Sequence, residues 1–104
     1  MVKQVVHACF ITLLAAGTAS FAQSGADLYK SKCQMCHAAD GRGNTPAGKS
    51  TKARPFNGPE VMKMSDAELT TVVTDGHNKM PAYKGKLTDA QIKEVIAYIH
   101  TLQK

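Results

Sequence analysis

The sequence has no tryptophan, and its 104 residues include only three phenylalanines, three tyrosines and three cysteines. With so few large side chains, a small domain is marginally stable unless something else fills its core. Three cysteines are also too few for a scaffold of several disulfides, or for a structural zinc site built from paired clusters. No segment alternates apolar and polar residues as a strand does, so we expect an all-α fold.

One long apolar stretch is present, at the N-terminus, and it has the features of an export signal. Lys3 precedes a mostly apolar run from 5 to 17, and the small residues Ser20 and Ala22 offer a cleavage point. The run is shorter than the about 20 residues that a membrane-spanning helix needs. We expect residues 1–22 to be removed as a secretory signal peptide; the alternative is an uncleaved anchor. Residues 23–104 would then form one domain without a stable membrane span.

The strongest chemical signal is two cysteines separated by two residues and followed at once by a histidine: Cys33, Cys36 and His37. This spacing is typical of covalent haem attachment, because each thiol can add across one vinyl group of the porphyrin. The neutral imidazole that follows can then bind the iron. A dithiol redox centre of thioredoxin type shares the cysteine spacing, but it expects a preceding strand that is not indicated here. We predict one haem c, bound through two thioethers, with His37 as an iron ligand.

A haem would also fill the core, for which this composition offers few large side chains. A large flat apolar disc can replace core side chains, so we expect the protein without haem to be largely unfolded. The segment from 46 to 59 is rich in glycine, proline, lysine and serine and has no periodicity. We expect this segment to wrap one edge of the disc.

Electron transfer favours a second axial ligand, and Met80 is the preferred candidate. It follows Gly76, which ends a predicted helix, and precedes Pro81, which fixes the local backbone in an extended loop. His/Met ligation is known for haem electron carriers. His77 or Lys79 could replace Met80 at altered pH, because both are close to it in sequence. The other candidates, which rank lower, are Met35, Met62, Met64 and His100.

Helical periodicity predicts three amphipathic helices. The first runs from Gly25 to His37, with Ser24 as its cap. The second and third begin at capping boxes, Ser-x-x-Glu at 65–68 and Thr-x-x-Gln at 88–91. The inner face of the third helix is the clearest in the chain and consists of Ile92, Val95, Ile96 and Ile99.

The charge balance is basic. The 13 lysines and arginines fall to 12 when Lys3 is removed with the signal, against 8 aspartates and glutamates. Lys79, Lys84 and Lys86 lie close to Met80 in sequence and would form a positive rim that attracts redox proteins with acidic docking surfaces. No aromatic residues alternate with the basic ones, so nucleic acid is not an expected partner.

Together, the segment from Cys33 to His37, the segment from Gly76 to Pro81 and the final amphipathic helix resemble the class I c-type cytochromes. The likeness is to the small soluble monohaem bacterial type and to the photosynthetic type that replaces plastocyanin. It implies a small all-α fold of about three to four helices around one haem. Its N- and C-terminal helices would cross, with Gly25 and Tyr29 of the first and Tyr98 of the last at family positions.

The resemblance also implies how the iron ligand His37 is held and what the protein does. The main-chain carbonyl of Pro46 would accept a hydrogen bond from the second imidazole nitrogen of His37. The implied function is a diffusible single-electron carrier rather than an enzyme, with a six-coordinate haem held by His37 and Met80. It would be a monomer, exported to the periplasm or, in a photosynthetic host, to the thylakoid lumen. The alternatives are a haem c subunit of a membrane-bound oxidase or dehydrogenase, and a ligand-binding haem sensor.

Overall fold

The structure, a computed structural model, describes residues 24–104. The predicted signal peptide, residues 1–22, lies outside this range. Six helices are present in the described range, where the only β pairing is two isolated bridges. None of these helices has the length and apolar character needed to cross a membrane. The helices are α1 (Gly25–Lys32), α2 (Gln34–His37), α3 (Pro46–Thr51), α4 (Pro59–Met62), α5 (Asp66–Asp75) and α6 (Asp89–Thr101).

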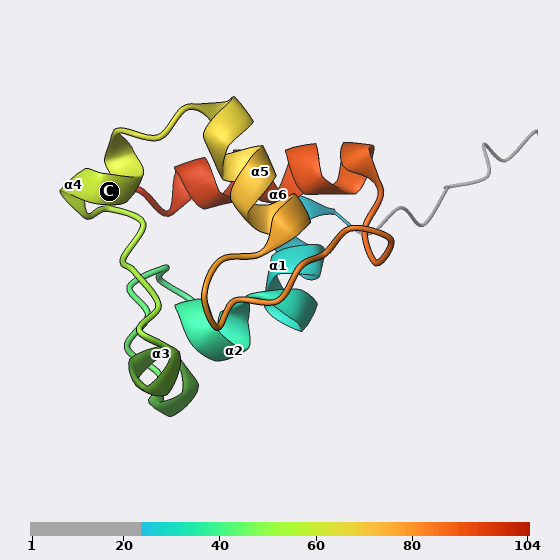
Figure 1. Cartoon of the computed structure of the whole chain (residues 1–104). Helices are drawn as coiled ribbons and strands as arrows, with labels where there is room; N and C mark the ends of the chain where they lie inside the picture. The colour runs from blue at the N-terminus through green and yellow to red at the C-terminus, as the bar shows by residue number, and fades with distance from the viewer. Residues whose placement is uncertain (1–23) are drawn as a thin grey trace, which may run out of the picture.

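The first and last helices pack against each other and form the centre of the fold (Figure 1). A Cβ atom at Gly25 would clash with the main-chain carbonyl of Glu94, so glycine lets the two helices approach closely. One turn on, the rings of Tyr29 and Tyr98 lie 5.1 Å apart between their centroids. The expected crossing of the N- and C-terminal helices is confirmed, and so is the all-α class.

Helices α5 and α6 begin where the capping boxes predict. The side chain of Ser65 accepts from the Glu68 N–H, and the side chain of Thr88 accepts from the Gln91 N–H. Two short polar sequences thus fix both helix starts. The buried face of α6 is also the predicted one, Ile92, Val95, Ile96 and Ile99.

The first predicted helix is split in two. We expected one helix from 25 to 37, but α1 ends at Lys32 and α2 begins at Gln34. Cys33 lies between them with φ −117° and ψ −33°, away from regular helical values. After α2, Ala38 takes a positive φ of 67°, and its carbonyl accepts a 2.5 Å hydrogen bond from the buried Tyr29 hydroxyl. The cysteine motif is therefore a separate turn. It follows α1 directly at Cys33, and the bond from Tyr29 to Ala38 ties its other end back to α1.

The segment from 46 to 59 is more regular than its composition indicates. Thr45 caps α3 through the Gly48 N–H, and Pro46 is the first helical residue. Pro59 occupies the same position in α4. Proline favours this position because it has no N–H to leave unpaired and its φ is already helical. Two short helices therefore replace the expected aperiodic wrap.

Candidate functional site

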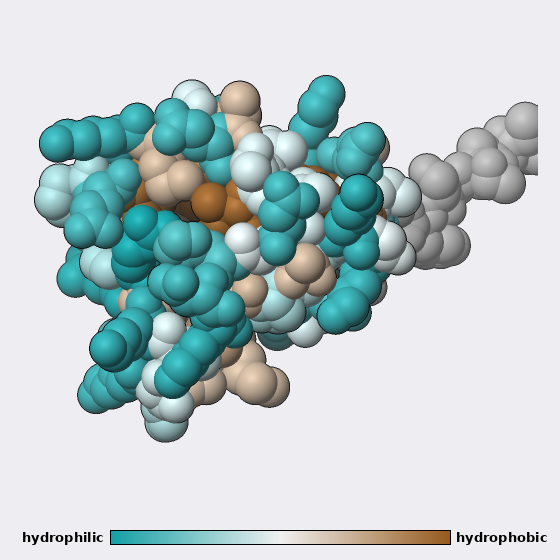
Figure 2. Space-filling view, viewed as in Figure 1, coloured by the Kyte–Doolittle hydropathy of each residue, from teal (hydrophilic) through white to brown (hydrophobic). Residues whose placement is uncertain are grey.

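A cavity of about 580 Å³ lies between the cysteine motif, α5, α6 and the loop that follows α5. This volume is within the range of about 300–1,000 Å³ that is common for cofactor sites. Cys33, Cys36, His37 and Met80 all line it. In Figure 2, hydrophobic residues lie at the bottom of a hollow that hydrophilic residues border. The apolar part of the lining includes Val61, Leu69, Val72, Val73, Val95 and Ile99.

The two cysteine sulfurs are in a setting that disfavours charge. Cys33 is 9% exposed and Cys36 is half-buried, and both are free thiols. Burial, with a smaller contribution from Cys36, raises the pKa of the Cys33 thiol to about 11. Cysteines that act as redox nucleophiles or bind zinc need a lowered pKa, so this environment opposes both alternatives. A neutral thioether sulfur is compatible with it.

His37 is half-buried, and its imidazole stacks on the ring of Phe56, with centroids 4.7 Å apart and planes 24° from parallel. Its Nδ1 atom is buried without a hydrogen-bond partner among the described residues. Burial, and then the positive charge of Arg54, lower the pKa of His37. The ring is therefore neutral at neutral pH, which is the form that binds metal.

Thr45, not Pro46, connects α3 to the cysteine motif. The Thr45 hydroxyl donates to the carbonyl of Met35 at 2.6 Å and is 3.2 Å from that of Cys36. Pro46 is exposed and does not line the cavity. With no partner at Nδ1 of His37, the expected bond from His37 to the Pro46 carbonyl is not formed here. Thr45 bonds to the carbonyls of Met35 and Cys36 instead, and not to His37.

Met80 ends a tight turn rather than lying in an extended loop. His77 and Met80 exchange two main-chain hydrogen bonds, of 3.1 and 2.8 Å, around Asn78, which has a φ of 50°. Asparagine tolerates this left-handed conformation. Gly76, at a φ of 77°, allows the turn to approach, since a Cβ there would lie 2.7 Å from the Met80 carbonyl oxygen. The Met80 side chain is half-buried and packs against the core.

Two contacts hold this loop to the other side of the cavity. The Lys79 ammonium donates to the Ser50 carbonyl at 3.3 Å, and the Tyr83 hydroxyl donates to the Lys32 carbonyl at 2.8 Å. The first reaches α3 and the second reaches the end of α1. The loop that carries Met80 is therefore fixed at two points, one on each side of the methionine.

The other methionines that were candidate iron ligands differ in how deeply they are buried. Met64 is half-buried and lines the same cavity as Met80. Met35 and Met62 are 78% and 53% exposed. Met64 is therefore the one rival methionine at the cavity. His77 also lines the cavity but is exposed, and its Nε2 is 3.2 Å from the side-chain nitrogen of Asn78.

Basic side chains contribute to the cavity lining: Lys32, Lys52, Arg54 and Lys79. Glu60 also lines it and pairs with Arg54 at 3.4 Å. The cavity therefore has an excess of positive charge, suited to an anionic group. Lys84 and Lys86, expected in the rim, are exposed but do not line the cavity.

These residues fit a haem. Two neutral sulfurs, a neutral imidazole and a thioether surround an apolar cavity of cofactor size. The basic residues suit propionate groups. Over residues 24–104, no three His, Cys, Asp or Glu side chains gather as a metal-binding group, which leaves zinc without a ligand set.

Comparisons with known proteins agree with this chemistry. Residues 20–99 match the family described as cytochrome c oxidase, cbb3-type, subunit III. Cytochrome c6 of Thermostichus vulcanus is 35% identical over 95 residues, which cover 91% of this chain and 82% of that protein. This chain belongs to the class I c-type cytochromes. Its cofactor is covalently bound haem c, and its role is electron transfer.

Two further relatives show the range of the family. The solved c-type cytochrome KustC0563 superposes with a TM-score of 0.72 at 30% identity, covering 78% of this cytochrome and 99% of that chain. The cbb3-type cytochrome c oxidase subunit CcoP of Azospirillum brasilense is 31% identical over 86 residues. That match covers 81% of this cytochrome but only 29% of the longer subunit. The same fold thus occurs as a small protein and as part of a larger one.

Proposed function

We propose that this cytochrome is an exported, diffusible single-electron carrier whose haem is held by Cys33 and Cys36 and ligated by His37 and Met80. The observation that carries the proposal is that these four side chains line one cavity, although Met80 is far from the other three in sequence. It would be a monomer and not an enzyme. Residues 1–22 would serve as a cleaved signal that directs the protein to the periplasm, or to the thylakoid lumen of a photosynthetic host.

The ligand set supports reversible one-electron transfer. Haem c, when bound, takes up and releases one electron at its iron. The lowered pKa of His37 keeps the imidazole neutral and available, because burial and Arg54 both oppose its protonation. The thioether of Met80 is a soft, weak donor that favours the reduced iron, so His/Met ligation raises the potential.

The surrounding residues keep water out and hold the ligands still. Apolar side chains from α5 and α6 cover the inner wall of the cavity, among them Leu69, Val73 and Val95. The contacts of Lys79 and Tyr83 fix the Met80 loop from both sides. A closed site with two protein ligands leaves no position for a substrate or a gas. This arrangement favours a carrier over an enzyme or a sensor.

The expected partners are redox proteins with acidic docking surfaces. Basic residues at the cavity attract such a surface and speed the encounter. Contacts between electron-transfer partners are small and short-lived, because the carrier must leave after each transfer. The similarity to a cytochrome c6 and to a subunit of a cbb3-type cytochrome c oxidase supports redox proteins as partners.

An absorption spectrum of the purified, exported protein, recorded with and without carbon monoxide, tests the proposal. The reduced protein should show the spectrum of a low-spin haem c, and carbon monoxide should not change it, because His37 and Met80 would both hold the iron and leave no place for the gas. A redox titration should give one one-electron step at a comparatively high potential. A colourless protein, or one that binds the gas readily, would contradict the proposal.

A second candidate function is that of a haem c subunit of a membrane-bound oxidase, favoured by the match to CcoP. The N-terminus of the mature protein discriminates between the two. Sequencing that starts near residue 23, with the cytochrome in the soluble fraction, supports a free carrier. An intact residue 1–22 segment in the membrane fraction supports the subunit.

A further inference from the structure

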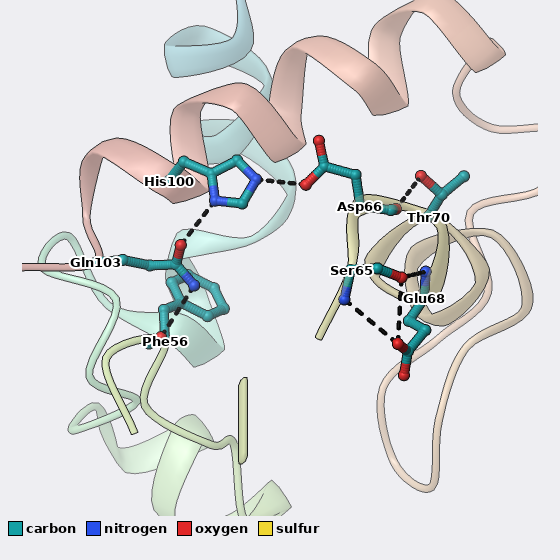
Figure 3. A network of polar contacts seen from close by, with 7 residues as sticks. All are labelled: Phe56, Ser65, Asp66, Glu68, Thr70, His100 and Gln103. Atoms are coloured by element: carbon teal, nitrogen blue, oxygen red, sulfur yellow. Dashed lines mark hydrogen bonds and ion pairs between the residues drawn. The ribbon is translucent and has the colours of Figure 1, made fainter. Parts of the chain in front are cut away.

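A chain of polar contacts links Asp66, His100 and Gln103 to Phe56 (Figure 3). The imidazole of His100, on α6, contacts Asp66 Oδ1 through Nε2 at 2.6 Å and Gln103 Oε1 through Nδ1 at 2.7 Å. The side-chain amide of Gln103 donates to the carbonyl of Phe56 at 3.1 Å. These contacts connect the start of α5 to the main chain of the residue that stacks on His37.

The chemistry of the partners fixes how each group is oriented. Because Gln103 Nε2 donates to a carbonyl, its Oε1 faces His100 as an acceptor. The other nitrogen of His100 faces a carboxylate, which is also an acceptor. Both contacts are satisfied only when His100 carries both ring protons. The hydrogen bonds of Gln103 and Asp66 accordingly raise the pKa of His100.

Phe56 is held at three points. Its N–H donates to the Gly41 carbonyl at 2.9 Å, its ring meets Tyr29 edge-on with centroids 6.1 Å apart, and its carbonyl accepts from Gln103. The ring is 7% exposed and stacks on His37. His37 Nδ1 has no hydrogen bond from the described residues, so the stacking on Phe56 restrains the tilt of the imidazole.

We propose that Gln103 is a positioning residue for the His37 imidazole, because it holds Phe56 in place and is itself oriented by His100. The inference rests on the proposed role of His37 as an iron ligand. Neither Gln103 nor His100 lines the cavity. The orientation of the ligand ring would therefore depend on the last residues of the chain, which act on it through a neighbour.

Two substitutions at Gln103 in the purified haem-loaded protein separate its contacts. Gln103→Met removes both contacts, whereas Gln103→Glu keeps an acceptor toward His100 but cannot donate to Phe56. Both variants should shift the proton resonances of the His37 ring and the haem methyl groups in the oxidised protein, and should shift the midpoint potential in the same direction.

Ser65→Ala is the control, because it removes the cap of α5 next to Asp66 without touching Phe56. It should lower thermal stability and leave the resonances and potential unchanged.

A pH titration tests the part played by His100. The charged group facing its ring from α5 is Asp66, and the facing group on its own segment is the neutral amide of Gln103. When His100 loses one proton, the remaining one stays with the carboxylate, so Gln103 loses its donor. The His37 resonances of the wild type should then move toward those of Gln103→Glu. In His100→Asn this transition should be missing, whereas any titration of the haem propionates should occur in both proteins.

Two results would overturn the inference alone, and a third would also overturn the proposed function. Wild-type resonances and potential in both Gln103 variants, with haem bound, would overturn the inference alone. A shift in Gln103→Met but not in Gln103→Glu would also overturn it, because the bond to Phe56 would then be unimportant. A wild-type protein without haem would overturn the proposed function as well.

Discussion

Thr45 donates a hydrogen bond of 2.6 Å to the carbonyl of Met35, which lies between the two cysteines of the haem motif. The same hydroxyl accepts from the Gly48 N–H at 2.9 Å. One side chain therefore caps α3 and attaches that helix to the motif. This contact makes the position of the cysteines depend on a residue outside the motif.

Replacing Thr45 by valine should lower the free energy of unfolding of the haem-loaded protein by about 1–2 kcal/mol, because the cap and the bond to Met35 are both lost. Denaturant unfolding followed by the haem absorbance measures this change. Thr51→Val, in the same helix, is the matched control, since its hydroxyl bonds mainly to the Ala47 carbonyl one turn back. An equal loss in both variants would show that the tie to Met35 contributes nothing.

Without haem, the protein should be largely unfolded. Without haem, the apolar side chains that line the cavity of about 580 Å³ face water instead of the porphyrin. The loss of this burial weighs heavily against the about 5–15 kcal/mol that stabilise a small domain. Far-UV circular dichroism of the Cys33→Ala/Cys36→Ala double variant should show little helix and no cooperative melting. A native-like thermal transition in that variant would disprove this.

Met80→Ala should abolish the iron–sulfur charge-transfer band, allow carbon monoxide to bind the reduced haem and lower the midpoint potential. Met64 lines the same cavity, so Met64→Leu is the control. This substitution nearly conserves volume and should retain the band at a cost of less than about 1.5 kcal/mol. The reverse pattern would identify Met64 as the iron ligand.

Reaction with an acidic redox partner should slow as salt is added, because the ions screen the basic residues at the cavity. Lys32→Gln should slow the reaction at low salt, since Lys32 lines the cavity. The control is Lys93→Gln on α6, an exposed lysine that does not line it. Stopped-flow rates should converge near about 1 M salt, where the screening length is about 3 Å. Rates that do not change with salt would refute steering by these residues.

The contact between His100 and Asp66 should stabilise the protein more in acid than in base. The pKa of His100 is raised in the folded protein, so its contribution is complete below about pH 6.5 and is lost as the pH rises through the raised pKa. Because the pair is exposed, the effect should stay below about 1 kcal/mol. Urea unfolding of wild type and His100→Asn should differ most near about pH 5 and converge near about pH 9. A difference that grows with pH would contradict this sign.

Local signals predicted the helices whose ends are set by their own side chains. Ser65 and Thr88 form capping boxes, so α5 and α6 begin where the sequence indicates. The same reasoning, applied to Thr45 before Pro46 and to Gly58 before Pro59, would have found α3 and α4. The many glycines and prolines in this segment hid the starts of α3 and α4. These helices, of 6 and 4 residues, are also too short to show an amphipathic pattern.

The residues proposed to bind haem were recognisable from chemistry, but their neighbours were not. Cys33, Cys36, His37 and Met80 carry their own sequence signals, and the structure places all four at one cavity. Phe56 and Thr45 reach His37 and Met35 through tertiary contacts that leave no periodic pattern. The role expected of Pro46 stays a prediction, since His37 Nδ1 has no hydrogen-bond partner among the described residues.

The packing of α1 on α6 has a consequence for biosynthesis. Helix α6 follows all the other described helices, so the core that it forms with α1 cannot close until α6 has been made. Once it closes, the Cys33 sulfur is buried and out of reach of an attachment enzyme. We therefore expect the thioether bond of Cys33 to form before the core closes, so that folding follows cofactor attachment.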